Sequence, residues 1–347
     1  MIRVAIVGTG AMAKQHATAL KKHDDCEIVA ACDLDAGRLD AFCREHGIPS
    51  GHRDLDELLA TESLDAVVNV TPDRHHKPVS LKALAANKHV LCEKPLAENH
   101  ADANEMARAA RTAGVVNMVN FSYRNAPAIQ MAANLVRAGE LGEIRHVEAS
   151  YLQSWLTSSH WGDWKTSDQW LWRLSSDHGS KGVLGDLGVH IVDFASFPVG
   201  EIRAVNCRLK TFDKAPDGRI RDYRLDANDS AVMTVEFTNG ALGTIHTSRW
   251  TTGFKNSLKL LVCGTTGALR VDLDRSETTI EVCLGRDVES VEWQSCPCDP
   301  TPDNWQRFLE SIRTGQPDQP DFTRGAAIQK VLDACEASHA QNRTVAL

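Results

Sequence analysis

The sequence has no hydrophobic run long enough to cross a bilayer, which takes roughly 20 apolar residues. Its first apolar run, 2–7, stops at Gly8 and carries no basic leader and no small-residue cleavage site, so we interpret it as a strand and not as a signal peptide. Ten cysteines are scattered through 347 residues, which is typical of a reducing cytoplasm and not of a secreted disulfide framework. We therefore expect a cytoplasmic protein without a membrane span.

Positive charge is also scarce, since 38 lysines and arginines stand against 46 acidic residues. The resulting net charge of −8 argues against a general attraction to nucleic acid or anionic membranes. Metal-ligand patterns are missing as well: Cys296-Pro297-Cys298 has no second ligand pair at zinc spacing, and His75-His76 has no partner pattern. We predict no metal site, no nucleic-acid partner and no membrane partner.

Residues 1–121 alternate short Val- and Ile-rich runs with helical patterns. The runs are almost continuously apolar, as parallel strands covered on both faces are. We expect strands at 2–7, 27–32, 66–70, 89–92 and 115–121, with helices at 11–22, 36–46, 55–59, 76–87 and 98–112. This order predicts an N-terminal Rossmann domain over 1–121, an α/β fold with a doubly wound parallel sheet.

The pattern changes after residue 121, where longer alternating strands become frequent. A helix is expected from Pro127 to about Ala138, a long strand over 144–152, and a Gly-flanked helix over 183–197. Further strands are expected at 204–209, 230–237, 241–249, 257–262, 268–271 and 279–283, and final helices at 304–314 and 323–342. Turn signals between the strands predict a second domain, 122–347, of α+β type with an open, mostly antiparallel sheet.

A glycine fingerprint lies directly between the first strand and the first helix. Gly8 permits a tight turn there, Gly10 allows a pyrophosphate to approach the backbone, and the small Ala13 allows close packing of helix and strand. Ala11 and Met12 begin the helix, whose positive N-terminus is where the phosphates bind. The segment predicts a dinucleotide site.

The second strand ends in Asp33, 20 residues beyond Ala13. A carboxylate at this position accepts the ribose hydroxyls of NAD and repels the 2′-phosphate of NADP. We therefore predict NAD as the cofactor. Arg38 could still receive a phosphate, so NADP stays open as a second possibility.

Three other segments carry side chains suited to chemistry. Segments 71–76 (TPDRHH) and 93–95 (EKP) each follow the end of a predicted strand, which is where ligands bind in open α/β sheets. Downstream, Asp186 and His190 are four residues apart, a spacing that places both side chains on one face of a helix.

Taken together, these segments closely resemble the glucose–fructose oxidoreductase/inositol dehydrogenase/MocA (Gfo/Idh/MocA) family of NAD(P)-dependent oxidoreductases. The resemblance covers essentially the whole chain, through the glycine fingerprint, TPxxxH, EKP, the segment 121–124 (FSYR) and GxxxDxGxH. It implies an enzyme that moves a hydride between nicotinamide and a CH–OH carbon of a sugar, sugar derivative or cyclitol. It also implies a homodimer or homotetramer formed through the C-terminal sheet.

The resemblance assigns the catalytic group to Lys94, Asp186 and His190. Elementary chemistry agrees, because an ordinary histidine pKa of about 6.5 suits His190 as the general base for the hydroxyl proton. The ammonium of Lys94 would stabilise developing alkoxide charge, or share the proton relay if burial lowers its pKa. Asp186 would orient His190 or bind an adjacent hydroxyl.

The resemblance also implies binding roles for other residues. It places the segment containing Thr71, Pro72 and His76 along the nicotinamide and Glu93 near the nicotinamide ribose. Residues of the segments 123–125 and 170–173 would approach the substrate, namely Tyr123, Arg124, Trp172 and Arg173.

The Trp-rich segment 155–172 matches no subfamily pattern and leaves the substrate open. Its indoles either form an aromatic wall for the apolar face of a sugar ring or pack a long loop against the sheet. Two other functions remain possible: a non-catalytic NAD(P)-binding sensor, and a reductase of an anhydro-ketose or trans-dihydrodiol that uses NADPH. The presence of both Lys94 and His190 favours an enzyme, since a pure sensor has no need of them.

Overall fold

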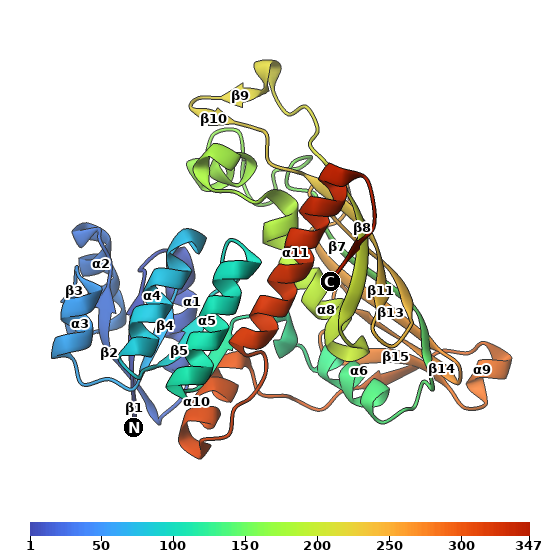
Figure 1. Cartoon of the computed structure of the whole chain (residues 1–347), viewed down its shortest axis with the longest axis horizontal. Coiled ribbons are helices and arrows are strands. Elements are labelled where there is room, and N and C mark those ends of the chain that lie inside the picture. The colour runs from blue at the N-terminus through green and yellow to red at the C-terminus, as the bar shows by residue number, and fades with distance from the viewer. The chain divides into compact units, whose positions relative to one another are not determined.

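The computed structural model describes all residues, 1–347, and divides into two compact units (Figure 1). The first unit contains residues 1–122 and 302–329, and the second contains residues 123–301 and 330–347. The long helix α11 (Phe322–Gln341) contributes to both units, because the division falls within it. No helix combines the length and apolar character that crossing a membrane requires.

The first unit is built on a six-stranded sheet in which every neighbouring pair of strands is parallel. The strand order is β3 (Ser50–His52), β2 (Cys26–Cys32), β1 (Ile2–Val7), β4 (Ala66–Asn69), β5 (His89–Cys92) and β6 (Asn117–Val119). This 3-2-1-4-5-6 order is that of a dinucleotide-binding sheet, with its ligand crevice at the carboxyl ends of the strands. The predicted doubly wound fold is confirmed, and only the short, apolar-poor β3 was missed.

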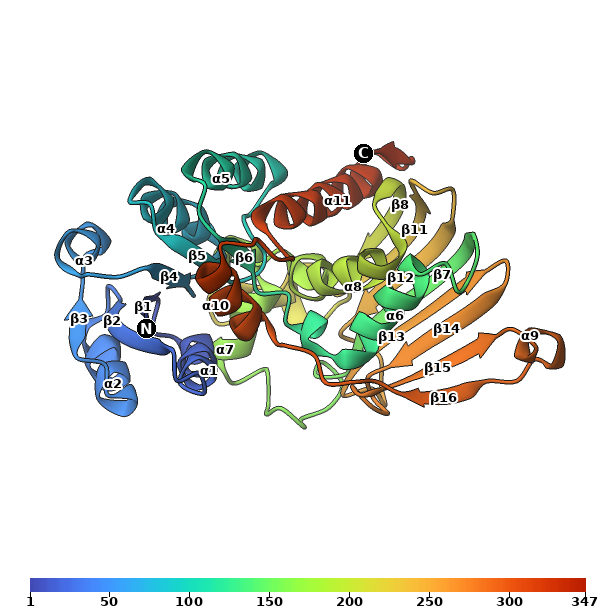
Figure 2. The same ribbon diagram turned by 90° about the horizontal axis from the view of Figure 1, so that it is seen from below.

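Helices cover both faces of this sheet (Figure 2). One face carries α1 (Ala11–Leu20), α2 (Ala36–His46) and α10 (Asn304–Thr314), and the other carries α3 (Leu55–Thr61), α4 (Asp73–Ala85) and α5 (His100–Ala113). On α10, Phe308 and Leu309 are buried in the same apolar core as Val4 and Ile6 of β1. The first unit therefore also contains residues 302–329, which follow the second unit's sheet in the sequence. The predicted division at residue 121 leaves these residues out of the first domain, because the order of elements along the chain does not show which core an amphipathic helix joins.

The second unit is built on a nine-stranded mixed sheet. The strand order is β16 (Gln294–Pro297), β15 (Thr279–Leu284), β14 (Gly267–Asp272), β13 (Asn256–Gly264), β7 (Ile144–Gln153), β12 (Leu242–Ser248), β11 (Ser230–Phe237), β8 (Ile202–Lys210) and β17 (Val345–Ala346). All pairs are antiparallel except β7 with β12. One face packs against α6 (Pro127–Arg137) and α8 (Val189–Val199) (Figure 2). The predicted open, mostly antiparallel sheet is confirmed.

A small aromatic lobe extends from this unit and comprises residues 154–174 and 212–225. Its core joins Trp155, Trp164 and Leu225 with further leucines, and Trp161 stacks on Trp170 with ring centroids 6.1 Å apart. The lobe contains the helix α7 (Asp168–Leu171) and the hairpin of β9 (Arg219–Ile220) and β10 (Tyr223–Arg224). Four of the five indoles of the segment 155–172 thus pack within the lobe, while Trp172 remains 36% exposed.

Short elements complete the chain. They are the 3-10 turns η1 (Ser122–Asn125), η2 (Trp172–Leu174), η3 (Ser176–His178) and η5 (Pro216–Gly218), the π-helix η4 (Leu184–Gly188), and the helix α9 (Asp287–Ser290).

Candidate active site

The glycine turn after β1 gives its two glycines different tasks. Gly8 has φ +91°, and a Cβ atom there would lie 2.7 Å from the Val70 carbonyl oxygen and 2.8 Å from the Thr71 nitrogen. Gly10 has φ −73°, which any residue can adopt, and a Cβ atom there would meet nothing within 4 Å. Gly8 is therefore required by the fold itself, whereas Gly10 leaves open space of the kind a pyrophosphate needs for close approach.

The N-terminus of α1 is built to receive an anion. Side chains of Asp35, Asp54 and Asn99 cap the helices α2, α3 and α5 by accepting backbone N–H groups. By contrast, α1 begins at Gly10 without a side-chain cap and without an acidic residue in its first turn. The first N–H groups of a helix without a cap carry partial positive charge and bind phosphate readily. The turn and the helix thus fit the phosphates of a dinucleotide.

Asp33, at the end of β2, lies beside this turn. Its carboxylate accepts hydrogen bonds from the Thr9 nitrogen and hydroxyl, both at 2.8 Å, and from the Arg38 guanidinium at 2.9 Å. Burial raises the pKa of Asp33, but the hydrogen bonds from Arg38, Asp35 and Thr9 outweigh it and lower the pKa to about 2. The carboxylate is ionised and suited to accept ribose hydroxyls, with a guanidinium at the same corner.

The strand-end loops after β4 and β5 are held together by His76. This side chain is buried, and its ring nitrogens lie 2.6 Å from the Pro95 carbonyl oxygen and 2.8 Å from the Thr71 carbonyl oxygen. Since both neighbours only accept, both nitrogens must donate, which requires the imidazolium form. Burial lowers the pKa of His76, but its contacts with Cys92, Asp73 and Pro95 outweigh burial and raise the pKa to about 10. His76 therefore ties the loops after β4 and β5 to each other.

Thr71 and Pro72 of the same loop lie at the start of α4. The Thr71 hydroxyl donates to Asn69 Oδ1 at 2.7 Å, and the amide of the buried Asn69 donates to the His76 carbonyl oxygen at 3.0 Å. Pro72 occupies the N-cap position of α4, which has no side-chain cap. The loop is thereby held rigidly at the carboxyl edge of the sheet.

Glu93, at the end of β5, is the centre of a buried network. Its Oε1 accepts from Asn120 at 2.7 Å and lies 2.8 Å from His16 Nε2, while Trp305 Nε1 donates to His16 Nδ1 at 2.9 Å. The indole bond places the ring proton of His16 on Nε2, from which it is donated to Glu93. Burial raises the pKa of Glu93, but the contacts with His16, Asn120 and Lys94 outweigh it and lower the pKa to about 2. A fixed carboxylate therefore directly precedes Lys94, which is itself half-buried.

In the second unit, Asp186 and His190 lie on consecutive elements and not on one regular helix. Asp186 is part of the π-helix η4, and His190 is in the first turn of α8, so the expected helix over 183–197 is present but has π geometry over Leu184–Gly188. The Asn228 side chain accepts the Leu184 N–H at 3.0 Å, at the start of this π-helix. Single π turns occur often at functional sites, where they change the direction of a side chain.

Asp186 is held by arginines from two other segments. Its Oδ2 accepts from Arg249 Nη2 at 2.9 Å and lies 3.8 Å from Arg173 Nε. The Arg173 guanidinium also lies over the Trp172 ring, 4.7 Å from its centroid. These contacts bring three predicted substrate-binding residues together, and they add Arg249, which the sequence reasoning missed.

His190 packs against two tyrosines. Its ring is edge-on to Tyr123, with centroids 4.9 Å apart, and to Tyr151, with centroids 6.2 Å apart. The two tyrosine hydroxyls are 2.6 Å apart, and both contact the Asn256 side chain at 2.8–3.0 Å. Burial, followed by the contact with Tyr123, raises the pKa of Tyr151 well above its ordinary value. The Tyr151 hydroxyl therefore keeps its proton, and the rings of both tyrosines hold the imidazole in place.

Arg124 forms a buried ion pair within the second unit. Its guanidinium donates to both oxygens of Asp193 on α8, at 2.6 and 2.7 Å, and lies 4.1 Å from the centroid of the Phe197 ring. Both charged side chains are less than 5% exposed. Arg124 thus anchors the turn that carries Tyr123 to the helix that carries His190.

The residues that sequence reasoning missed are mostly ordinary types at positions without a motif. His16, Asn120 and Trp305 support Glu93, whereas Tyr151, Asn256 and Arg249 support His190 and Asp186. One signal was available for His16, which lies on the predicted first helix three residues beyond Ala13 of the fingerprint. No comparable signal marked the others.

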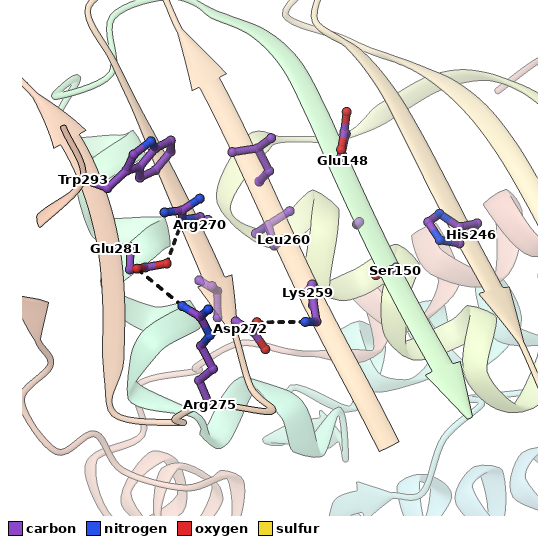
Figure 3. Close-up of a pocket in the computed structure, with 13 residues that line it drawn as sticks. Glu148, Ser150, His246, Lys259, Leu260, Arg270, Asp272, Arg275, Glu281 and Trp293 are labelled. Atoms are coloured by element: carbon purple, nitrogen blue, oxygen red, sulfur yellow. Dashed lines mark hydrogen bonds and ion pairs between the residues drawn. The ribbon is translucent and has the colours of Figure 1, made fainter. Parts of the chain in front are cut away.

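The second unit also has a shallow pocket of about 420 Å³ on the sheet (Figure 3). Its charged side chains pair with one another: Lys259 with Asp272 at 2.9 Å, and Arg270 with Glu281 at 2.7 Å, beside Trp293. None of the predicted site residues lines it. No group of three or more His, Cys, Asp or Glu side chains in the chain is arranged to hold a metal ion.

Comparison with known proteins identifies the family of both units. Residues 2–121 match the GFO_IDH_MocA family, described as an oxidoreductase family with an NAD-binding Rossmann fold. Residues 129–270 match the GFO/IDH/MocA C-terminal domain. The predicted resemblance and the NAD-binding character of the first unit are therefore confirmed.

Individual relatives support the same family assignment. D-glucoside 3-dehydrogenase from Escherichia coli is 31% identical over 255 residues, which are 71% of this chain and 70% of that protein. Levoglucosan dehydrogenase from Pseudarthrobacter phenanthrenivorans is 28% identical over 250 residues, which are 67% of this chain but less than two thirds, 62%, of that protein. The crystal structure of an oxidoreductase domain protein from Kribbella flavida superposes with a TM-score of 0.88 at 29% identity, covering 99% of this chain and 98% of that one. Because the glycine fingerprint, the folds of both units and these matches agree, the chain belongs to the Gfo/Idh/MocA family of NAD-binding oxidoreductases.

Proposed function

We propose that this protein is an NAD-dependent dehydrogenase that oxidises a secondary hydroxyl of a sugar or sugar derivative, reversibly, to a ketone. The observation that carries the proposal is that Asp186, held by two arginines, and His190, held by two tyrosines, lie four residues apart in a chain whose other unit belongs to an NAD-binding family. The two curated relatives described above are dehydrogenases of a glucoside and of levoglucosan, which supports a sugar in preference to a cyclitol.

The residues divide the chemistry among them. Bound NAD, held by the turn at Gly10, the N-terminus of α1 and Asp33, would accept the hydride that leaves the substrate carbon. In the proposal, the Lys94 ammonium donates a hydrogen bond to the reacting oxygen and stabilises its negative charge. His190 takes the hydroxyl proton, and Asp186 accepts a hydrogen bond from a neighbouring hydroxyl of the sugar. In the reverse direction His190 returns the proton.

NAD is the proposed cofactor in preference to NADP. The Asp33 carboxylate is ionised and would repel a 2′-phosphate. Arg38 is bound to that same carboxylate and so offers only part of its charge to a phosphate. Titration with NADH and NADPH tests this: we expect NADH to bind at least tenfold more tightly, a difference of about 1.4 kcal/mol, and equal or stronger binding of NADPH would contradict the role of Asp33.

The activity is tested with a panel of glucosides, anhydrosugars and inositols, with NAD reduction followed at 340 nm. We expect turnover of at least one sugar, and we expect Lys94→Ala to reduce kcat by at least about 10³-fold while NADH binding is retained, because a positioned charge next to the reacting oxygen acts mainly in the transition state. The exposed Lys22 is a matched control, and Lys22→Ala should behave as wild type. A silent panel with intact NADH binding would favour a sensor, and an unchanged kcat in Lys94→Ala would reject the proposed site.

We further propose that copies of the chain associate through the outer face of the nine-stranded sheet. Along β13 this face presents Lys259 and Leu261 half-exposed, alternating with the buried Leu258 and Leu260. An open sheet face of this kind is usually covered in solution. Light scattering of the purified protein tests the proposal, and a monomeric mass at micromolar concentration would reject it.

A further inference from the structure

We propose that Arg249, which follows directly after β12, is a positioning residue that keeps Asp186 in a fixed direction as a hydrogen-bond acceptor for substrate. This inference rests on the proposed function and deepens it. It assigns Asp186 to substrate binding and leaves proton transfer to His190.

Arg249 joins three segments of the second unit through one guanidinium. Nη1 donates to the Arg173 carbonyl oxygen at 3.0 Å, and Nη2 donates to Asp186 Oδ2 at 2.9 Å and to the Gly182 carbonyl oxygen at 3.4 Å. Arg173 belongs to η2, Gly182 lies two residues before the π-helix η4, and Asp186 lies within η4. The planar fork of donors in an arginine suits such a junction, whereas the three donors of a lysine all radiate from a single nitrogen.

The side chain is completely buried, with 0% exposure, and its guanidinium lies 5.1 Å from the centre of the Trp155 ring. A charge in such surroundings needs a partner, because the cost of removing it from water is several kcal/mol. Asp186 is the carboxylate in direct contact. The next, Asp229, is itself paired with the buried Lys214 at 2.6 Å. The Arg249–Asp186 pair is therefore the main charge compensation at this point.

Two arginines face Asp186 and favour its anionic form. Arg249 lies at 2.9 Å and Arg173 at 3.8 Å, from two different segments. Burial lowers the pKa of Arg249 and the Asp186 carboxylate partly restores it, so the two charges depend on each other. An acid–base role would require Asp186 to gain a proton and leave Arg249 buried without compensation. Accepting a hydrogen bond from a sugar hydroxyl requires no such change.

The test is a double-mutant cycle with Arg249→Met and Asp186→Asn, with Arg249→Lys as the conservative variant. Sugar affinity is measured by calorimetry in the presence of NADH, together with kcat, KM and the pH profile of kcat/KM. NADH affinity and the melting temperature are recorded for every variant. The exposed Arg137 on α6 is the matched control, and Arg137→Met should behave as wild type.

We expect Arg249→Met to weaken sugar binding and lower kcat/KM by about tenfold or more, as loss of a hydrogen bond to a charged group does, with NADH affinity unchanged. The double variant should be no worse than Asp186→Asn, because both changes remove the same interaction. Arg249→Lys should recover part of the loss. In Arg249→Met the pH profile of kcat/KM should keep its shape, because the group that transfers the proton in the proposal is His190 and not Asp186.

Sugar affinity within twofold of wild type in Arg249→Met, or losses that multiply in the double variant, would overturn the inference. If Arg249→Met does not fold, the cycle of Arg249→Lys with Asp186→Asn decides by the same criteria. Failure of the proposed function looks different: Lys94→Ala would then keep its turnover, or no sugar would be oxidised. Because the cycle uses sugar affinity, it judges Arg249 separately from catalysis, and absence of sugar binding by the wild-type protein would overturn both.

Discussion

The two glycines of the first turn offer the sharpest test of how this fold holds its cofactor. They are two residues apart, and the same change, glycine to alanine, should damage different properties. At Gly8 an added Cβ atom would lie 2.7 Å from one backbone atom and 2.8 Å from another, with φ at +91°. At Gly10 it would meet no protein atom within 4 Å, and φ is −73°.

The magnitudes follow from this geometry. For Gly8→Ala, the positive φ costs about 1–2 kcal/mol, and forcing the ends of β1 and β4 apart adds about 1–3 kcal/mol. The free energy of unfolding should therefore fall by about 2–5 kcal/mol. Gly10→Ala should change it by no more than about 0.5 kcal/mol. The methyl group would instead occupy the space of the pyrophosphate and weaken NADH binding by at least tenfold, which is about 1.4 kcal/mol.

Urea unfolding followed by tryptophan fluorescence measures the first quantity, and titration with NADH measures the second. Both variants are compared with the wild type in the same buffer. If Gly10→Ala were as unstable as Gly8→Ala, or bound NADH normally, the assignment of open space above Gly10 to the cofactor would be refuted.

Two buried charges give the remaining predictions. The folded-state pKa of His76 is raised from 6.5 to about 10, so the stability that it contributes is complete below pH 6.5 and is lost as the pH rises through 10. In urea unfolding between pH 6 and pH 10, His76→Gln should remove this pH dependence of the free energy of unfolding. An unchanged pH dependence in the variant would contradict the imidazolium form of His76. Arg124→Met leaves Asp193 buried without its cation and should lower the free energy of unfolding by about 3–5 kcal/mol. The double variant Arg124→Met/Asp193→Leu should lose less stability, because no unpaired charge stays buried. A larger loss in the double variant than in Arg124→Met, measured by the urea midpoint, would argue against the pair.

Local features of this chain were predictable because contiguous residues encode them. The apolar runs of β1, β4 and β5 and the helices between them follow from hydrophobic periodicity, and the glycine turn follows from a short fingerprint between strand and helix. Asp33 could be located by its distance from the fingerprint. The π-helix at Leu184–Gly188 could not, because its wider turn depends on packing and capping by Asn228, which is distant in sequence.

The sequence by itself determined the fold class, the NAD-binding turn and the residues Lys94, Asp186 and His190 as candidates. The tertiary structure decided what surrounds them: Arg249 reaches Asp186 across 63 residues, His16 reaches Glu93 across 77, and Trp305 reaches His16 across 289. It also decided that α10 joins the core of the first unit and that Arg124 is a buried anchor. The physical reason is that periodicity and turn chemistry act between neighbours along the chain, whereas a buried charge takes whichever partner the folded chain brings within hydrogen-bond distance.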